Sequence, residues 1–193
     1  TPSKAEAEIH QLPDGRYEVR SGTADMGQGA TEMLTRLAAE YLGVPMDQVV
    51  APTPHTDRVP YDTRTTSSRS THMMSRALEA AAKDLLNHGS IGRGFVSNEG
   101  GLDPDTGQGI ASSHWHQGAA SAQVEVDTET GLIDVTTLYA SSYAGRVVNR
   151  AGAELQNEGS MIMALGSALF EEIQYNEGQM ANPNLSDYNI ASA

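Results

Sequence analysis

The chain has 193 residues, a formal net charge of −13 and no cysteine. The acidic balance argues against electrostatic binding to nucleic acid or to an anionic membrane surface. The lack of cysteine excludes disulfides, thiolate metal ligands and a cysteine nucleophile within the chain. No apolar run reaches the roughly 18 residues of a membrane span, and we expect a cytoplasmic protein.

The first part of the chain predicts a β-hairpin, a helix and a short strand. Residues 5–22 alternate around a Pro-Asp-Gly turn at 13–15, which is typical of a hairpin. Apolar residues at helical spacing follow as far as residue 42, where Gly43 ends the predicted helix. A short strand is expected over 47–51.

A Gly-Gln-Gly turn, formed by Gly27, Gln28 and Gly29, connects the hairpin to this helix. The start of a helix offers free amide groups and the positive end of the helix dipole. Such a place suits an anion, most often a phosphate, and the Gln28 amide can both donate and accept hydrogen bonds. The alternative is a tight turn without a ligand, because two glycines do not specify a binding partner.

The segment 63–71, which we call the hydroxyl loop, has the most unusual composition of the chain. Seven of its nine residues carry a hydroxyl group, and the other two are Arg64 and Arg69. A second amphipathic helix follows directly. Ser and Thr are common helix caps and linker residues, so the loop can be read as structural. It can equally be a ligand-binding loop, with hydroxyl groups around phosphate oxygens and an arginine that neutralises their charge.

The remaining chain predicts an irregular region at 89–118, a second hairpin at 119–139 and a third helix at 151–174. The core face of that helix is expected to hold five apolar side chains: Leu155, Ile162, Leu165, Leu169 and Ile173. His114 and His116 lack a third ligand nearby, so we assign no metal site.

These elements indicate an α+β fold in which β-hairpins pack with amphipathic helices. We expect two lobes. Residues 1–118 would form the first lobe and residues 119–193 the second.

Eight short motifs, taken in order, resemble the molybdenum-cofactor-binding region of the xanthine dehydrogenase and aldehyde oxidase family, bacterial type. They are Met-Gly-Gln-Gly at 26–29, the hydroxyl-rich stretch at 65–71, Asp-Pro-Asp-Thr-Gly-Gln-Gly at 103–109, Val-Glu-Val-Asp at 124–127, Gly-Arg-Val-Val-Asn at 145–149, Gln-Asn-Glu-Gly at 156–159, Ala-Leu-Phe-Glu-Glu at 168–172 and Asn-Leu-Ser-Asp-Tyr at 184–188. The match covers nearly the whole chain and implies one part of a larger molybdopterin-binding domain.

The resemblance implies a set of cofactor-binding residues. Four side chains would contact the pterin and its phosphate: Gln28, Ser68, Ser70 and Gln156. Their neighbours would line the same site: Gly27, Gly29, Thr65, Thr66, Ser67 and Arg69. Gln156 is placed by the resemblance alone. The chain departs from the family pattern at Arg150, where proline is usual, and at Ser160, where glycine or another small residue is usual.

The resemblance also implies the activity of a molybdenum hydroxylase, which oxidises a small organic substrate with water as the oxygen source. Electrons would leave through iron–sulfur clusters and FAD on other subunits or domains. The cofactor is expected in its cytosine dinucleotide form. The family's general-base glutamate has no counterpart in these residues, so we assign no catalytic residue. We expect a fragment of a large subunit, inactive alone, whose partners are the rest of that subunit and the iron–sulfur and flavin subunits.

Two other functions stay open at this point. One is a non-catalytic module that binds or assembles the cofactor. The other is an unrelated domain that binds a nucleotide phosphate at the Gly-Gln-Gly turn.

Overall fold

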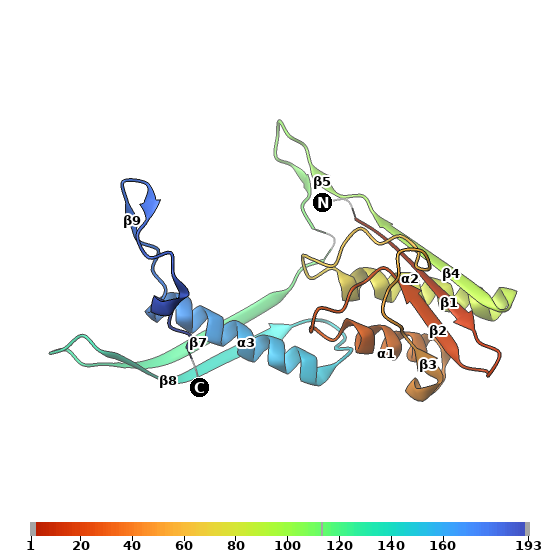
Figure 1. The fold of residues 1–193 in the computed structure, drawn as a ribbon, viewed down its shortest axis with the longest axis horizontal. Helices are drawn as coiled ribbons and strands as arrows, with labels where there is room; N and C mark the ends of the chain where they lie inside the picture. Colours follow the sequence, from red (N-terminus) through yellow and green to blue (C-terminus); the bar gives the residue numbers. More distant parts are fainter. Residues whose placement is uncertain (1–2, 113, 192–193) are drawn as a thin grey trace. The chain divides into compact units, whose positions relative to one another are not determined.

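The computed structural model describes residues 3–112 and 114–191. The chain divides into two units, Thr1–Trp115 and His116–Ala193. Helices and strands occur in both units, which confirms the predicted α+β class (Figure 1). Within the described residues, no helix is both long enough and apolar enough to cross a membrane.

The first unit contains a four-stranded sheet with the strand order β3-β2-β1-β4. β1 (Ser3–Gln11) and β2 (Tyr17–Ser21) are antiparallel and form the predicted first hairpin. β3 (Val49–Val50) follows the short 3-10 helix η1 (Met46–Gln48) and pairs in parallel with β2. The short strand predicted over 47–51 is therefore confirmed at residues 49–50, while residues 47 and 48 belong to η1.

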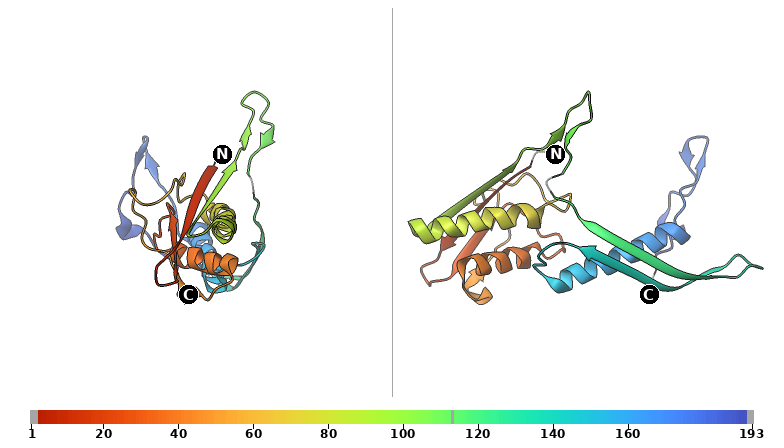
Figure 2. Two further views of the ribbon diagram at one scale, coloured as in Figure 1. Left: turned by 90° about the vertical axis from the view of Figure 1, so that its right-hand side faces the viewer. Right: turned by 180° about the vertical axis from the view of Figure 1, so that it is seen from behind.

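Two helices, α1 (Ala30–Leu42) and α2 (Ser70–His88), cover one face of this sheet (Figure 2). Both were predicted, and Gly43 caps α1 with a left-handed φ of 70°. Their apolar stripes meet the inward-facing side chains of the strands, which forms the core of the unit. The largest fully buried side chains come from both layers: Ile9, Val19, Met73, Met74 and Leu78.

β4 (Ile91–Asn98) forms the edge of the sheet beside β1, although the sequence predicted an irregular segment there. The prediction was wrong because Gly92 and Gly94 resemble loop residues. In the structure, a Cβ atom at Gly94 would overlap the carbonyl oxygen of Ala77, and one at Gly92 would overlap that of Ala81. These glycines therefore allow the backbone of α2 to lie directly on the strand.

The first unit ends in a small hairpin of β5 (Gly101–Leu102) and β6 (Gly109–Ile110). The turn between them is closed by Asp103. Its Oδ1 accepts hydrogen bonds from the amides of Asp105 and Thr106 at 3.0 and 2.8 Å. The amide and then the hydroxyl group of Thr106 contribute most to a lowered pKa of Asp103, followed by the amide of Asp105.

The second unit is built around the long hairpin of β7 (Gln117–Val126) and β8 (Ile133–Tyr143), which confirms the second predicted hairpin. A bulge interrupts the pairing between Gln123 and Val124. Helix α3 (Arg150–Leu169) packs along β8. The chain continues through the two-residue strands β9 (Tyr175–Asn176) and β10 (Gln179–Met180) to the short helix η2 (Leu185–Asp187).

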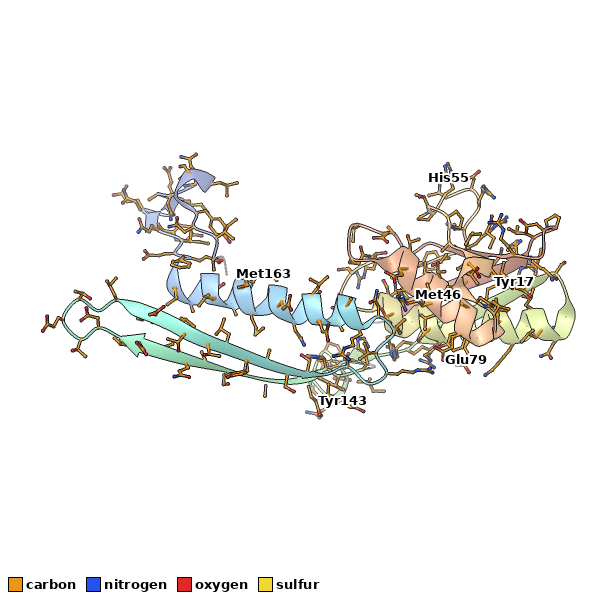
Figure 3. The ribbon with its side chains drawn as sticks, turned by 90° about the horizontal axis from the view of Figure 1, so that it is seen from below. Tyr17, Met46, His55, Glu79, Tyr143 and Met163 are labelled. Carbon is orange, nitrogen blue, oxygen red and sulfur yellow. The ribbon has the colours of Figure 1, made fainter. Side chains whose placement is uncertain are left out.

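The apolar face predicted for the third helix is not buried within this unit. α3 ends at Leu169, and within it only Gly166 is buried. Leu155 and Met163 are 67% and 64% exposed, and Tyr143 at the end of β8 is 70% exposed. Figure 3 labels Met163 on α3 and Tyr143 on β8. The prediction failed because a two-stranded hairpin offers too little surface to cover an amphipathic helix.

Candidate functional site

The Gly-Gln-Gly turn is closed by the side chain of Gln28. Its Oε1 accepts a hydrogen bond from the Met26 amide at 2.6 Å, and its Nε2 donates one to the Ala24 carbonyl oxygen at 2.9 Å. Gly27 and Gly29 have φ values of 102° and 80°, which glycine adopts at little cost. The turn therefore keeps its shape through bonds of its own, and a ligand that binds the Gln28 amide must exchange these bonds.

The amide groups at the start of α1 are bound by the carboxylate of Asp25. Its Oδ1 accepts hydrogen bonds from Gly27 and Gly29 at 3.0 and 3.3 Å, and its Oδ2 accepts one from Thr31 at 2.8 Å. The bond from Thr31 contributes most to a lowered pKa of Asp25, followed by the bond from Gly27. The sequence predicted free amides for a phosphate at this turn, but a carboxylate from the same chain already occupies these three.

Direct hydrogen bonds join the approach to this turn to the hydroxyl loop, two segments that the sequence singled out separately. The Ala24 amide donates to Oγ1 of Thr65 at 3.0 Å, across 41 residues of sequence. The Thr23 hydroxyl donates to Oδ2 of Asp62, also at 3.0 Å. The structure thus places the two segments side by side in the first unit.

Arg69 is the buried centre of the hydroxyl loop, with 6% of its surface exposed. Its Nη1 forms an ion pair with Oδ1 of Asp62 at 2.7 Å and also donates to the carbonyl oxygen of Arg64. Its Nε donates to the Ser3 hydroxyl at 2.6 Å, and its Nη2 donates to the Lys4 carbonyl oxygen at 2.8 Å. Arg69 is therefore not placed to neutralise the charge of a ligand, because the carboxylate of Asp62 already neutralises its guanidinium group.

Arg64 differs from Arg69 in every one of these respects. Its side chain is exposed, and it forms no ion pair with any residue in the described ranges 3–112 and 114–191. Of the two arginines considered from the sequence, Arg64 is therefore the one that can approach an anionic ligand.

A strained turn within the hydroxyl loop leads into α2. The amide of Arg69 donates to the carbonyl oxygen of Thr66 at 3.2 Å, and the two residues between them, Ser67 and Ser68, have φ values of 54° and 51°. A turn of this kind favours glycine or asparagine, because a left-handed conformation costs other residues energy. The turn places three exposed residues that carry hydroxyl groups, Thr66, Ser67 and Ser68, directly before the helix.

The start of α2 is open, in contrast to the start of α1. The Met73 amide makes the first helical bond, to the carbonyl oxygen of Arg69 at 2.9 Å. No side chain in the described part of the chain accepts a hydrogen bond from the amides of the preceding three residues, 70–72, and the first turn has no acidic residue. These amides and the neighbouring hydroxyl groups are suitable donors for phosphate oxygens.

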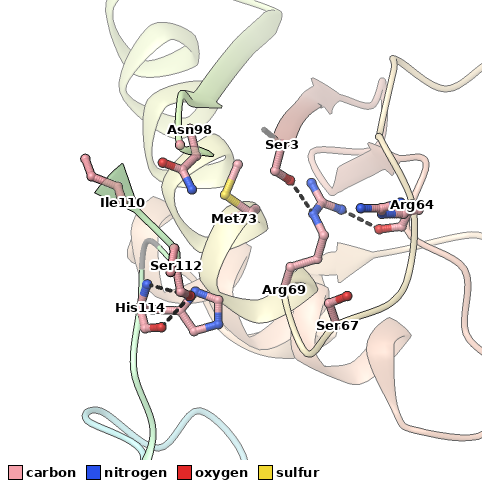
Figure 4. Close-up of a pocket in the computed structure, with 11 residues that line it drawn as sticks. Ser3, Arg64, Ser67, Arg69, Met73, Asn98, Ile110, Ser112 and His114 are labelled. Atoms are coloured by element: carbon pink, nitrogen blue, oxygen red, sulfur yellow. Dashed lines mark hydrogen bonds between the residues drawn. The ribbon is translucent and has the colours of Figure 1, made fainter. Parts of the chain in front are cut away.

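A pocket of about 180 Å³ lies beside the hydroxyl loop (Figure 4). Its wall includes Arg64, Ser67, Ser112 and His114. The His114 ring stacks on the ring of His72 in the first turn of α2, with 4.5 Å between the ring centres.

The environment of His72 favours the neutral imidazole. Burial lowers its pKa, and the charges of His114 and Arg76 lower it further. Its Nε2 atom is buried and has no hydrogen-bond partner among the residues that the structure describes. Within the described residues, no group of three or more histidine or acidic side chains is arranged to hold a metal ion.

Gln156 lies on α3 and therefore belongs to the second unit. Its side chain is exposed, and its Nε2 is 3.5 Å from the hydroxyl oxygen of Ser160. The N-terminus of α3 is capped by Asn149, whose Oδ1 accepts a hydrogen bond from the Gly152 amide at 3.2 Å. The other nine predicted site residues all lie in the first unit, at 27–29 and 65–70.

Sequence reasoning missed two residues that organise the site, Asp25 and Asp62. An aspartate just before a predicted helix is a known capping signal, so the position of Asp25 could have revealed its role. Asp62 had no such signal, because its partners Thr23 and Arg69 are reached only through the fold.

The chain matches the model of one family, the molybdopterin cofactor-binding domain, over residues 1–90 and 87–193. It is 28% identical over 228 residues to the xanthine dehydrogenase molybdenum-binding subunit of Escherichia coli O157:H7, covering 96% of this chain and 30% of that protein. It is 27% identical over 201 residues to the xanthine dehydrogenase of Oryza sativa subsp. japonica, covering 91% of this chain and 15% of that protein. The chain thus spans less than a third of the length of these relatives.

Solved structures share the fold. The aldehyde oxidoreductase of Desulfovibrio desulfuricans superposes with a TM-score of 0.85 at 20% identity, covering 99% of this chain and 23% of that one. The Cu,Mo-CO dehydrogenase superposes with a TM-score of 0.81 at 22% identity, covering 98% of this chain and 29% of that one.

Proposed function

The chain belongs to the molybdopterin cofactor-binding domain family, and we propose that it binds the phosphate of a molybdenum cofactor at the open start of α2. Membership of this family favours molybdopterin binding over an unrelated nucleotide-binding domain. The proposal is that the open amides of residues 70–72 and the hydroxyl groups of Ser68 and Ser70 donate to the phosphate oxygens.

The single observation that carries this proposal is the difference between the two helix starts. Asp25 binds the amides at the start of α1, whereas no side chain in the described ranges caps α2. A phosphate needs several uncommitted donors that converge on it, and the hydroxyl loop supplies them next to α2. The exposed guanidinium of Arg64 can add a positive charge there in an otherwise acidic chain.

We propose that two glutamines complete the contacts. The amide of Gln28 would exchange its bonds to Met26 and Ala24 for bonds to the pterin, and Gln156 would contribute from α3. The remaining proposed lining residues are Gly27, Gly29, Thr65, Thr66, Ser67 and Arg69. The side chains of two of these, Thr65 and Arg69, already have protein partners, so they would act from behind the surface of the site.

For the whole protein, we propose the activity of a molybdenum hydroxylase that oxidises a small organic substrate with water as the oxygen source. When bound, the cofactor supplies the redox centre, and the residues of this chain bind and orient it. We propose the cytosine dinucleotide form of the cofactor, with iron–sulfur clusters and FAD on other subunits or domains. The location would be the cytoplasm, and these residues without the rest of the large subunit would be inactive.

The proposal is tested by measuring molybdenum and pterin in the assembled protein that contains this chain. Ser68→Ala combined with Ser70→Ala should reduce both contents by about tenfold or more, because hydrogen bonds to a charged group are lost. Ser90→Ala, which removes an exposed hydroxyl group after the opposite end of α2, is the matched control. Unchanged pterin content in the double variant would contradict the proposed site, and a wild-type protein without pterin would contradict the function itself.

A second experiment, an assay of substrate oxidation, separates the catalytic protein from a non-catalytic cofactor-binding module. In both cases the wild-type protein would contain molybdenum and pterin. Only a hydroxylase would incorporate oxygen from ¹⁸O-labelled water into an oxidised substrate. A loaded protein that oxidises none of a panel of aldehydes, purines and N-heterocycles would favour the binding module.

A further inference from the structure

We infer that Asp62 and Arg69 are positioning residues, whose buried ion pair holds the hydroxyl loop in the shape that binds the phosphate of the cofactor. This inference rests on the proposed function and concerns how the site is kept in place. Neither residue would touch the cofactor itself.

The pair is too deeply buried to be a surface salt bridge. The side chain of Asp62 is 1% exposed and that of Arg69 is 7% exposed, with Oδ1 and Nη1 2.7 Å apart. Taking two charges out of water is costly, and apolar residues of similar size often stabilise a fold as well or better. A buried pair is therefore weak evidence for a role in stability alone, and its contacts must show what else it does.

Those contacts join three segments of the first unit. Arg69 donates to the Ser3 hydroxyl and the Lys4 carbonyl oxygen on β1, and to the carbonyl oxygen of Arg64 within the hydroxyl loop. Asp62 accepts a hydrogen bond from Thr23, which leads into the Gly-Gln-Gly turn. One ion pair thus fixes the hydroxyl loop both to the sheet and to the other candidate binding segment.

Further bonds hold residues 61–63 along the first half of β1, so the start of the hydroxyl loop is also fixed to the sheet. The Glu6 amide donates to the Tyr61 carbonyl oxygen at 2.9 Å, and the Thr63 amide donates to the Lys4 carbonyl oxygen at 3.1 Å. Beyond this anchor, the chain from Arg64 to Ser68 is tied back mainly by Arg69 and by the bond of Thr65 to Ala24.

The pair also maintains the strained turn that carries the proposed phosphate ligands. Ser67 and Ser68 have left-handed φ values of 54° and 51°, and Arg69 is the residue that ends this turn and precedes α2. Strain of this kind persists only where surrounding contacts enforce it. Without the four bonds of Arg69, the turn would relax, and the hydroxyl groups of Ser68 and Ser70 would no longer converge with the amides of α2.

The test uses the assembled protein and compares variants of the pair with a variant of the core that lowers the melting temperature by a similar amount. Arg69→Gln and Asp62→Asn break the ion pair, while Leu78→Ala removes fully buried core volume on α2 away from the loop. Melting temperature and pterin content per polypeptide are measured for each. We expect Arg69→Gln and Asp62→Asn to lose at least tenfold more pterin than Leu78→Ala at an equal loss of melting temperature.

Two further variants keep the test decisive. The double variant Asp62→Asn with Arg69→Gln should lose no more pterin than Arg69→Gln alone, because the two residues act as a unit. If Arg69→Gln yields no folded protein, Arg69→Lys, which keeps the charge but not the planar set of donors, is compared with Leu78→Ala instead.

The outcomes are separable from those of the proposed function. If the wild-type protein contains pterin, and the pair variants lose it only in proportion to their melting temperature, as Leu78→Ala does, the pair is merely structural and the inference is overturned. A wild-type protein without pterin would instead overturn the proposed function.

Discussion

Oδ2 of Asp25 accepts a hydrogen bond from the amide of Thr31 at 2.8 Å, although six residues separate them in the chain. The same carboxylate binds the amides of Gly27 and Gly29, so the chain supplies its own anion to the start of α1. The start of α2 receives no such group from the described residues. Two helices that look alike in sequence, each preceded by a polar loop, therefore differ in their capacity to bind a phosphate.

The first prediction concerns Asp25 and acid. Hydrogen bonds from Thr31 and Gly27 hold the pKa of Asp25 below its ordinary value of 3.8. Because the folded pKa is lower than the unfolded one, the carboxylate stabilises the fold at a pH above the unfolded pKa. This contribution is lost as the pH falls through the folded pKa. Asp25→Ala should remove this part of the acid sensitivity and speed amide exchange at Gly27, Gly29 and Thr31.

Hydrogen exchange followed from pH 6 down to pH 3 measures this effect directly. Asp57→Ala, which removes an exposed carboxylate from a loop, is the control and should leave exchange at the start of α1 unchanged. Equal exchange at Thr31 in wild-type protein and Asp25→Ala would show that the carboxylate does not cap the helix in solution.

The second prediction concerns the strained turn. Ser67 has a φ of 54°, a conformation that costs a residue with a side chain about 1–2 kcal/mol and costs glycine little. Glycine also loses more chain entropy on folding, so Ser67→Gly should stabilise the protein by a net amount of about 0.5–1 kcal/mol. Urea denaturation measures the change, and Ser67→Val should lower the midpoint. A lower midpoint for Ser67→Gly would mean that the serine hydroxyl outweighs the strain.

Local patterns were sufficient to predict the first hairpin, α1, α2 and the second hairpin, because each carries its own periodicity and its own turn residues. β4 was missed for a physical reason. In the sequence, a glycine that lets a helix backbone lie close to a strand cannot be distinguished from a glycine in a loop. Only the structure shows that Gly94 lies directly against the backbone of Ala77. The helical stripe of α3 was read correctly as apolar, but no local pattern says what covers it.

The candidate site was predictable in composition but not in its connections. The unusual hydroxyl content of residues 63–71 and the Gly-Gln-Gly turn were visible in the sequence. The joining of these segments through Thr65 and Asp62 depends on β1 and β2 being paired, which is a property of the fold. For the same reason the sequence could not decide whether Arg64 or Arg69 would face a ligand, whereas the structure shows that Arg69 is bound to β1, to Asp62 and to Arg64.

The third prediction tests the close approach of α2 and β4. A Cβ atom at Gly94 would overlap the carbonyl oxygen of Ala77 and crowd the amide of Ala81, and both are backbone atoms that a rotamer change cannot move. Gly94→Ala should therefore destabilise the protein by about 3 kcal/mol, the upper part of the range for overpacked cores. Gly101→Ala, where an added Cβ meets no atom within 4 Å, is the matched control. A change below about 1 kcal/mol at Gly94 would place the helix farther from the strand than the structure does.

The last prediction concerns His72, whose pKa is lowered from 6.5 mainly by burial and further by the charges of His114 and Arg76. As the pH falls below 6.5, the unfolded chain takes up a proton on this imidazole before the folded chain does. Protonation therefore favours unfolding, and stability is lost as the pH falls from the unfolded pKa towards the folded one. His72→Gln removes the titrating group, so it should lose less stability between pH 7.5 and pH 5.5 than the wild-type protein.

Urea denaturation at the two pH values gives this difference, and the other groups that titrate in this range contribute to both proteins alike. NMR titration of the ring protons provides a second readout, since the signal that disappears in His72→Gln belongs to His72 and should shift at a pH below 6.5. An equal loss of stability in both proteins, with a His72 signal that shifts at pH 6.5 or above, would mean that water or His114 satisfies the buried Nε2. In that case the first turn of α2 would be more accessible to solvent than the structure shows.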